Sequence, residues 1–86
     1  MRIFAALADP TRVRILDALS ERAYTAGEIV GLYDISQPSV SRHLRVLREA
    51  GLVSATTRGR QRVYRLEPAT LREIDSWLDR YRRFWS

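Results

Sequence analysis

Apolar residues recur at helical spacing over residues 2–19. They predict a short helix over residues 2–8, with one face made of Ile3, Phe4 and Leu7. A second helix is expected from Pro10 to about Leu19, because Asp9 can cap it and proline suits the first helical position. The residues expected to face inward are Val13 and Leu16, with Ile15 as a further candidate.

A helix-turn-helix is predicted over residues 24–51. Tyr24-Thr25 is expected to be a short extended link whose threonine caps a third helix, because Glu28 three residues later completes a capping-box pattern. The apolar residues of this helix are Ile29, Val30 and Leu32. It is expected to end near Tyr33, where a tight two-residue connection leads into a fourth helix.

The fourth helix carries signals at both of its ends. Ser36 can cap its start, and Pro38 is tolerated in the first turn, where no intrahelical bond needs the missing N–H. Gly51 lies where a helix end favours a left-handed residue. One apolar stripe, at spacings of four and three residues, is formed by Val40, Leu44 and Leu47.

The side of the fourth helix away from this stripe is unusual for a solvated surface. It holds Gln37, Ser39, Ser41, Arg42 and Arg45. Amide, hydroxyl and guanidinium groups can hydrogen-bond base edges and phosphates in the major groove of DNA. An ordinary exposed helix face more often mixes Glu with Lys, so this face predicts a DNA-reading helix.

A β-hairpin is predicted over residues 53–66, where residues that favour strands are common. Its tip is expected at Arg58-Gly59-Arg60, with Arg62 just along the strand. A hairpin directly after a helix-turn-helix is a wing. A hairpin with a purely structural role would not need three arginines near its tip.

A last helix is predicted to begin at Pro68 and to continue up to Trp85. Its wide apolar stripe is formed by Leu71, Ile74, Leu78, Tyr81 and Trp85, flanked by Trp77 and Phe84. A stripe of this width exceeds what one protomer of 86 residues can readily cover, so it predicts the interface of a symmetric dimer. A ligand pocket and a membrane-surface face are the alternatives.

Length and charge narrow the class of protein. Eighty-six residues predict a single domain over residues 1–86, and the absence of cysteine excludes disulfides and thiolate metal sites. Residues 36–65 hold seven of the 15 basic residues, all arginine, and one of the ten acidic residues. This third of the chain therefore has a charge of +6, which suits a polyanion such as nucleic acid. A solubilising basic surface is the alternative.

Neither a membrane segment nor a signal peptide is expected. The longest apolar runs are far shorter than a membrane span, and residues 1–3 are not followed by the apolar stretch of a signal peptide. We therefore expect a cytoplasmic protein without a membrane partner.

Other polar groups do not predict an active site or a metal site. The serines around the fourth helix have only His43 as a general base, so no catalytic residue and no enzyme activity are expected. A lone histidine cannot hold a metal ion by itself, so His43 is expected to pack or to bond the backbone, with a phosphate contact left open. Asp75 and Asp79 are expected to pair with arginines of their own helix.

Four segments carry a resemblance to a known family. They are ALADPTR at residues 6–12, ISQPSVSRHL at residues 35–44, LREAGLV at residues 47–53 and GRQRVY at residues 59–64. In this order and spacing they resemble the ArsR/SmtB family of bacterial winged-helix transcriptional repressors. The resemblance implies a mainly α-helical winged helix-turn-helix with a small β-hairpin, which dimerises through its first and last helices. It also implies a sequence-specific regulator that binds double-stranded DNA at a palindromic operator and blocks transcription.

The resemblance assigns roles to particular positions. It implies that the base-reading residues are Gln37, Ser39, Ser41 and Arg42. Arg45 would join them or touch phosphate, and Arg58 and Arg60 would be wing contacts in or beside a minor groove. The contacts of the homodimer would come from Ile3, Phe4, Leu7, Leu71, Ile74, Leu78, Tyr81 and Trp85.

The chain departs from the metal-sensing members of that family. They carry a cysteine pair on the third helix, where this chain has AGEIVGLY at residues 26–33, and others use histidine on the last helix, which has none here. No metal site and no cofactor are therefore expected, and the sequence leaves open whether a small-molecule or metal inducer exists. A winged-helix protein-interaction module and a non-specific nucleic-acid binder are the alternative functions.

Overall fold

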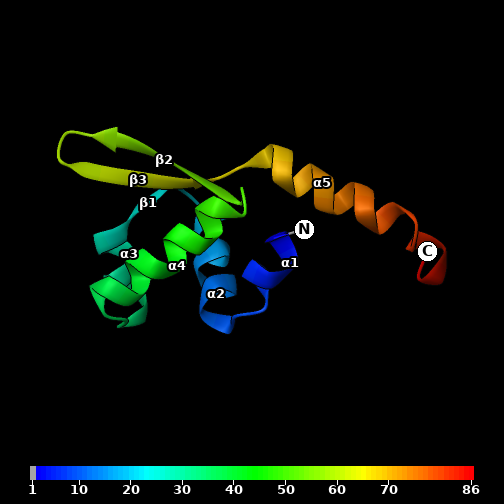
Figure 1. Ribbon diagram of the computed structural model, residues 1–86, viewed down its shortest axis with the longest axis horizontal. Coiled ribbons are helices and arrows are strands. Elements are labelled where there is room, and N and C mark those ends of the chain that lie inside the picture. The colour runs from blue at the N-terminus through cyan, green and yellow to red at the C-terminus, as the bar shows by residue number, and fades with distance from the viewer. Residues whose placement is uncertain (1) are drawn as a thin grey trace.

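The computed structural model describes residues 2–86, which form a group of four helices against a small sheet and a fifth helix that projects away from them (Figure 1). The elements in chain order are α1 (Arg2–Leu7), α2 (Pro10–Leu19), β1 (Tyr24–Thr25), α3 (Ala26–Tyr33), α4 (Gln37–Glu49), β2 (Val53–Arg58), β3 (Gln61–Leu66), α5 (Pro68–Asp79) and the 3-10 helix η1 (Arg82–Phe84). The predicted mainly helical fold with a β-hairpin is confirmed. The projecting α5 stretches the molecule to 46 Å along its longest axis, against 23 and 22 Å along the others.

The predicted caps fix where three helices begin. Asp9 accepts a hydrogen bond from the backbone amide of Arg12 at 3.0 Å. Thr25 and Glu28 make both bonds of the capping box, at 3.1 and 2.8 Å. Ser36 accepts from the amide three residues further along at 3.3 Å. Each cap satisfies an amide that has no partner within its own helix.

The apolar stripe of α4 lies at the centre of the core. Val40, Leu44 and Leu47 are at most 1% exposed, as the spacing predicts. They share one cluster of buried side chains with Ile15 of α2, Ile29 of α3, Val53 of β2 and Leu52, which precedes β2. The opposite side of α4 is consequently turned toward solvent.

The inward face of α2 differs from the prediction at one position. Val13 is 38% exposed, whereas Ile15, Ala18 and Leu19 are buried and Leu16 is half-buried. Residues 15, 18 and 19 follow the three- and four-residue spacing of one helix face, and Val13 lies nearly half a turn away from Ile15. The position of the facing helices selects between two overlapping apolar stripes on α2.

The extended link Tyr24-Thr25 is a strand of the sheet. β1 pairs with β3 in an antiparallel sheet of order β1-β3-β2, with Tyr24 opposite Tyr64. This pairing attaches the start of α3 to the hairpin. The sequence indicated extended backbone here, but a partner strand forty residues away leaves no local signal.

The hairpin turns at its predicted tip. Arg58 pairs with Gln61, so Gly59 and Arg60 form a two-residue turn, and Gly59 has a φ of 63°. Successive side chains of a strand point to opposite faces. Residues 62 and 64 of β3 therefore share one face, and residues 61, 63 and 65 share the other.

The last helix ends earlier than predicted. α5 stops at Asp79 and a short 3-10 turn follows, instead of one helix up to Trp85. Arg82 folds back along α5, where its guanidinium pairs with Asp75 and, at 2.6 Å, with Asp79. This ion-pair group confirms the expected pairing of the two aspartates. The turn between α5 and η1 has no glycine or proline to mark it. No residue of α5 is buried in the described protomer.

Arg12 joins α1, α2 and α4 at the start of α2. Its guanidinium donates to the backbone carbonyl of Ala6 at 2.7 Å and lies 3.3 Å from Nδ1 of His43 on α4. The carboxylate of Asp9 is 3.9 Å from the same nitrogen. His43, expected to pack or to bond the backbone, is mostly buried and contacts these two side chains instead.

A substitution at Gly51 tests how α4 ends. Gly51 has a φ of 78°, and the following amide donates to the carbonyl of Leu47 at 3.0 Å, which is a Schellman motif. A Cβ at Gly51 would also lie 3.2 Å from Oγ1 of Thr70. We expect Gly51→Ala to lower the free energy of unfolding by about 1–2 kcal/mol in urea titrations. Gly31→Ala is the control, because Gly31 lies in the middle of α3 and a Cβ added there would meet no neighbouring atom within 4 Å. This variant should not lower the free energy of unfolding. Equal losses in the two variants would contradict the role assigned to Gly51.

Acid titration of stability tests the cap of α2. The amide of Arg12, with the nearby charges of His43 and Arg12, holds the pKa of Asp9 below its ordinary value. A carboxyl whose pKa is lowered by folding stabilises the protein above its unfolded pKa, and this contribution is lost as the pH falls through the folded pKa. Asp9→Asn keeps an oxygen that can cap, so its unfolding free energy should fall less than the wild type's between about pH 4 and pH 2. Asp17→Asn, on the same helix, is the control. If the unfolding free energy of Asp9→Asn fell with acid as much as that of the wild type, the stabilising role of the Asp9 carboxylate would be refuted.

Candidate nucleic-acid interface

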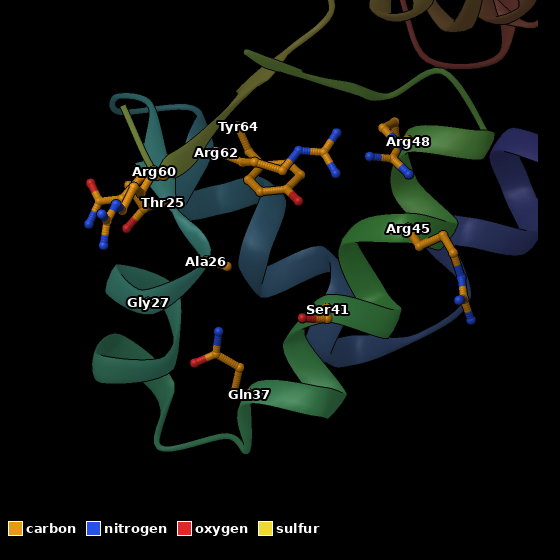
Figure 2. Close-up of a pocket in the computed structure, with 11 residues that line it drawn as sticks. Thr25, Ala26, Gly27, Gln37, Ser41, Arg45, Arg48, Arg60, Arg62 and Tyr64 are labelled. Carbon is orange, nitrogen blue, oxygen red and sulfur yellow. The ribbon is translucent and has the colours of Figure 1, made fainter. Parts of the chain in front are cut away.

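A cleft of about 470 Å³ lies between α4, the start of α3 and the inner face of the hairpin. It is lined by Thr25, Ala26, Gly27, Gln37, Ser41, Arg45, Arg48, Arg60, Gln61, Arg62 and Tyr64. Figure 2 shows the side chains of α4 on one side of this space and those of the hairpin and the start of α3 on the other. We call this surface the arginine cleft.

One side of α4 supplies four of the lining residues. Gln37, Ser41, Arg45 and Arg48 recur at intervals of four, four and three residues, so they share one side of the helix, and all four are exposed. The buried stripe holds this side next to the hairpin. These four side chains form a row of hydrogen-bond donors about three helical turns long.

Two predicted base-reading residues lie outside the arginine cleft. Arg42 is exposed on the part of α4 most directly opposite the buried stripe. Ser39 is half-buried on the flank further from the hairpin, and its backbone amide donates to the Ser36 cap. The reading face proposed from the sequence therefore extends across the outward surface of α4, from the cleft to this far flank.

The hairpin contributes arginines to both of its faces. Arg60 and Arg62 line the arginine cleft, and the guanidinium of Arg62 lies 5.9 Å from the ring centre of Tyr64. Arg58 pairs with Gln61 and lines a separate hollow on the other face of the sheet. The structure thus brings Arg60 together with Gln37, Ser41 and Arg45, and it does not bring Arg58 there.

Two of the four lining arginines, Arg48 and Arg62, were not assigned a DNA contact from the sequence. Arg48 belongs to the row that begins at Gln37, and its spacing of eleven residues from Gln37 was a usable signal. Arg62 follows from the alternation of β3, since it shares a face with Tyr64. Thr25 and Gly27 reach the cleft only through the pairing of β1 with β3, which nothing local predicts.

The charge of the arginine cleft has one sign. Arg45, Arg48, Arg60 and Arg62 line it, and none of its lining residues is acidic. Guanidinium groups match phosphate oxygens as bidentate donors, and they remain charged at any physiological pH. The cleft is therefore suited to a phosphate backbone, with Gln37 and Ser41 able to hydrogen-bond base edges.

A second surface, on α1, α5 and the segment that follows α5, is apolar. The rings of Phe4 and Trp77 pack at a tilt with centres 4.8 Å apart, and those of Trp77 and Tyr81 with centres 5.0 Å apart. Of the residues predicted for a dimer interface, Phe4, Leu71, Tyr81 and Trp85 are exposed and Leu7, Ile74 and Leu78 are half-buried. Ile3 is the exception: at 4% exposure it belongs to the core of the protomer, so it has almost no surface to offer a partner.

Residues 2–86 contain neither a metal-binding cluster nor a membrane-spanning helix. No three His, Cys, Asp or Glu side chains in this range are grouped so that they could hold a metal ion. No helix in the same range is long and apolar enough to cross a membrane.

Known proteins resemble this chain in sequence and in fold. The family model for bacterial regulatory proteins of the arsR family matches residues 9–55. The transcriptional repressor SdpR of Bacillus subtilis (strain 168) is 38% identical over 76 residues, which are 88% of this chain and 84% of that protein. The HTH-type transcriptional regulator Rv2034 of Mycobacterium tuberculosis is 40% identical over 85 residues, covering 99% of this chain and 77% of that protein.

A solved structure extends the similarity to the fold. An ArsR-like transcriptional regulator from Rhodococcus sp. RHA1 superposes with a TM-score of 0.85 at 32% identity, over 98% of this chain and 79% of that one. The matched family segment includes the whole of α4, so the similarity covers the helix that supplies most of the arginine cleft.

Proposed function

The chain belongs to the ArsR family of bacterial regulatory proteins, and from this premise we propose that it represses transcription as a homodimer bound to a palindromic operator. Members of this family are DNA-binding regulators of transcription and not enzymes, in agreement with the sequence prediction. A regulator of this kind acts on the chromosome, so we place its site of action in the cytoplasm.

The arginine cleft is the observation that supports this proposal most directly. A rigid helix presents amide, hydroxyl and guanidinium donors along one side, and an arginine-bearing hairpin faces that side. A B-DNA major groove is wide enough to admit an α-helix, and a hairpin beside it can reach the adjacent minor groove. The shape and the sign of the charge both fit duplex DNA.

We assign the roles of the residues by their position on α4 and the hairpin. Gln37, Ser39, Ser41 and Arg42 read base edges from the outward face of α4. The remaining arginines, which supply affinity through phosphates and the wing, are Arg45, Arg48, Arg58, Arg60 and Arg62. Phosphate contacts fix register and orientation, while base contacts select the sequence.

The apolar surface on α1, α5 and the segment that follows α5 supports the homodimer. Phe4, Leu71, Tyr81 and Trp85 are large apolar side chains left exposed on one protomer. A second copy would cover them, and symmetric dimers are the commonest assembly of this kind. Two copies of α4 related by a twofold axis would enter successive major grooves, with half-sites about 10 bp apart, centre to centre.

Removal of Arg42 tests sequence reading. We expect Arg42→Ala to weaken binding to the preferred operator by about 1–3 kcal/mol and to relax discrimination at one base pair of each half-site. The operator would be selected from a random duplex library, and affinities would be measured by fluorescence anisotropy on it and on its single-base variants. Arg80→Ala, on α5, is the matched control for loss of one positive charge. An equal loss of affinity on every sequence would make Arg42 a phosphate contact only.

Removal of Arg60 tests the wing. Each phosphate contact lowers the slope of log affinity against log salt concentration by about 0.9. We therefore expect Arg60→Ala to flatten that slope by about one contact and to leave the order of preferred sequences unchanged. Titrations of the operator and of an unrelated duplex at several salt concentrations give both quantities. A wild-type slope in Arg60→Ala would refute a phosphate role for this residue.

A further inference from the structure

We propose that the outer face of the hairpin is a second phosphate-binding surface, which holds the DNA that flanks each half-site. The surface is formed by Arg22, Arg58 and Arg65, and we call it the outer arginine face. This inference rests on the proposed DNA-binding function and extends it, because it adds a contact beyond the arginine cleft.

The three arginines line one hollow. It has a volume of about 370 Å³ and lies on the side of the sheet opposite the arginine cleft. Arg58 pairs with Gln61 and Arg65 with Ser54, so both side chains project from that side. Arg22 precedes β1 and closes the hollow from the edge of the sheet.

Two of the guanidinium groups are held in place by neighbouring groups. Arg22 lies over the ring of Tyr24 at 3.7 Å from its centre and donates to the carbonyl of Ala23 at 2.7 Å. Arg65 donates to Oγ1 of Thr56 at 3.3 Å. Side chains that are already ordered lose less entropy when they bind an anion, so the face is better suited to binding than three mobile arginines would be.

The hollow has an excess of positive charge. Its one carboxylate is Glu28, which accepts from the amide of Thr25 at 2.8 Å and from Arg22 at 3.3 Å. Across residues 2–86, neither Arg58 nor Arg65 forms a salt bridge with a carboxylate within 4.0 Å. Two guanidinium groups are therefore available to an external anion.

The position of the outer arginine face favours duplex DNA over an acidic protein. Thr25 and Gln61 line both the arginine cleft and the outer hollow, so the two surfaces meet around the hairpin. β1 pairs only with residues 63 and 64 of β3, which leaves the tip of the hairpin to project beyond it (Figure 1). A projecting hairpin laid over a minor groove has phosphates on both sides of it. A duplex bound in the cleft continues past the wing, toward the outer arginines.

Duplexes of two lengths test the proposal. The short duplex ends at the outer edges of the two half-sites of the selected operator, and the long duplex adds about 10 bp of unrelated sequence on each side. We expect the wild-type protein to bind the long duplex more tightly, and the Arg58→Gln/Arg65→Gln variant to lose most of this advantage. On the long duplex, loss of two phosphate contacts should reduce the fall in affinity between about 50 and 200 mM salt by roughly tenfold.

Controls separate this inference from the function on which it rests. Arg72→Gln/Arg80→Gln on α5 removes the same charge and should keep the wild-type ratio of long-duplex to short-duplex affinity. Circular dichroism and urea titration establish that both variants fold. Equal wild-type affinity for the two duplexes would overturn the outer contact while the operator function stands, and so would an equal loss on both in Arg58→Gln/Arg65→Gln. Absence of any preferred duplex for the wild type would overturn the proposed function itself.

Discussion

The packing of α4 against the middle of the protein is the constraint on which the rest of the structure depends. Val40, Leu44 and Leu47 are almost completely buried, so rotation of α4 about its axis would expose them and carry guanidinium groups into the core. Full burial of one such apolar side chain is worth about 1.5–3 kcal/mol, and burial of an unpaired charge is strongly unfavourable. Both effects oppose rotation of α4. The buried apolar residues of α4 therefore determine which of its side chains face solvent.

Local chemistry explains which parts of the fold were predictable. The caps at Asp9, Thr25 and Ser36 and the turn at Gly59 depend on a few neighbouring residues, and the structure confirms them. The predictions fail where the structure depends on contacts with residues far away in the sequence. Two apolar stripes overlap on α2, so periodicity alone favours Val13 as an inward residue although it is exposed. The partner strand of β1 lies too far along the chain to leave a local signal. α5 ends at Asp79, and no glycine or proline marks this end in the sequence.

The same distinction applies to the candidate interface. Gln37, Ser41 and Arg45 were found from the helical spacing, and the hairpin places Arg60 opposite them. Arg48 follows the same spacing, so the sequence contains a signal for it as well. Arg58 and Arg60 both flank the tip of the hairpin, so the sequence predicts the same role for them. Strand alternation, however, places Arg58 on the face of the hairpin opposite the arginine cleft. The position of a residue in the β-ladder therefore predicts its face of the hairpin better than its distance from the tip does.

Arginines concentrate at the hairpin and α4, whereas the exposed aromatic residues lie on α1 and on the segment that follows α5. We infer that α4, held in place by its contacts with the core, reads DNA from the major groove. Methylation interference at guanine N7, which lies in that groove, tests it most directly on the selected operator. We expect interference in two patches related by a twofold axis and separated by about one helical turn. Interference at no N7 position within a bound operator would contradict it.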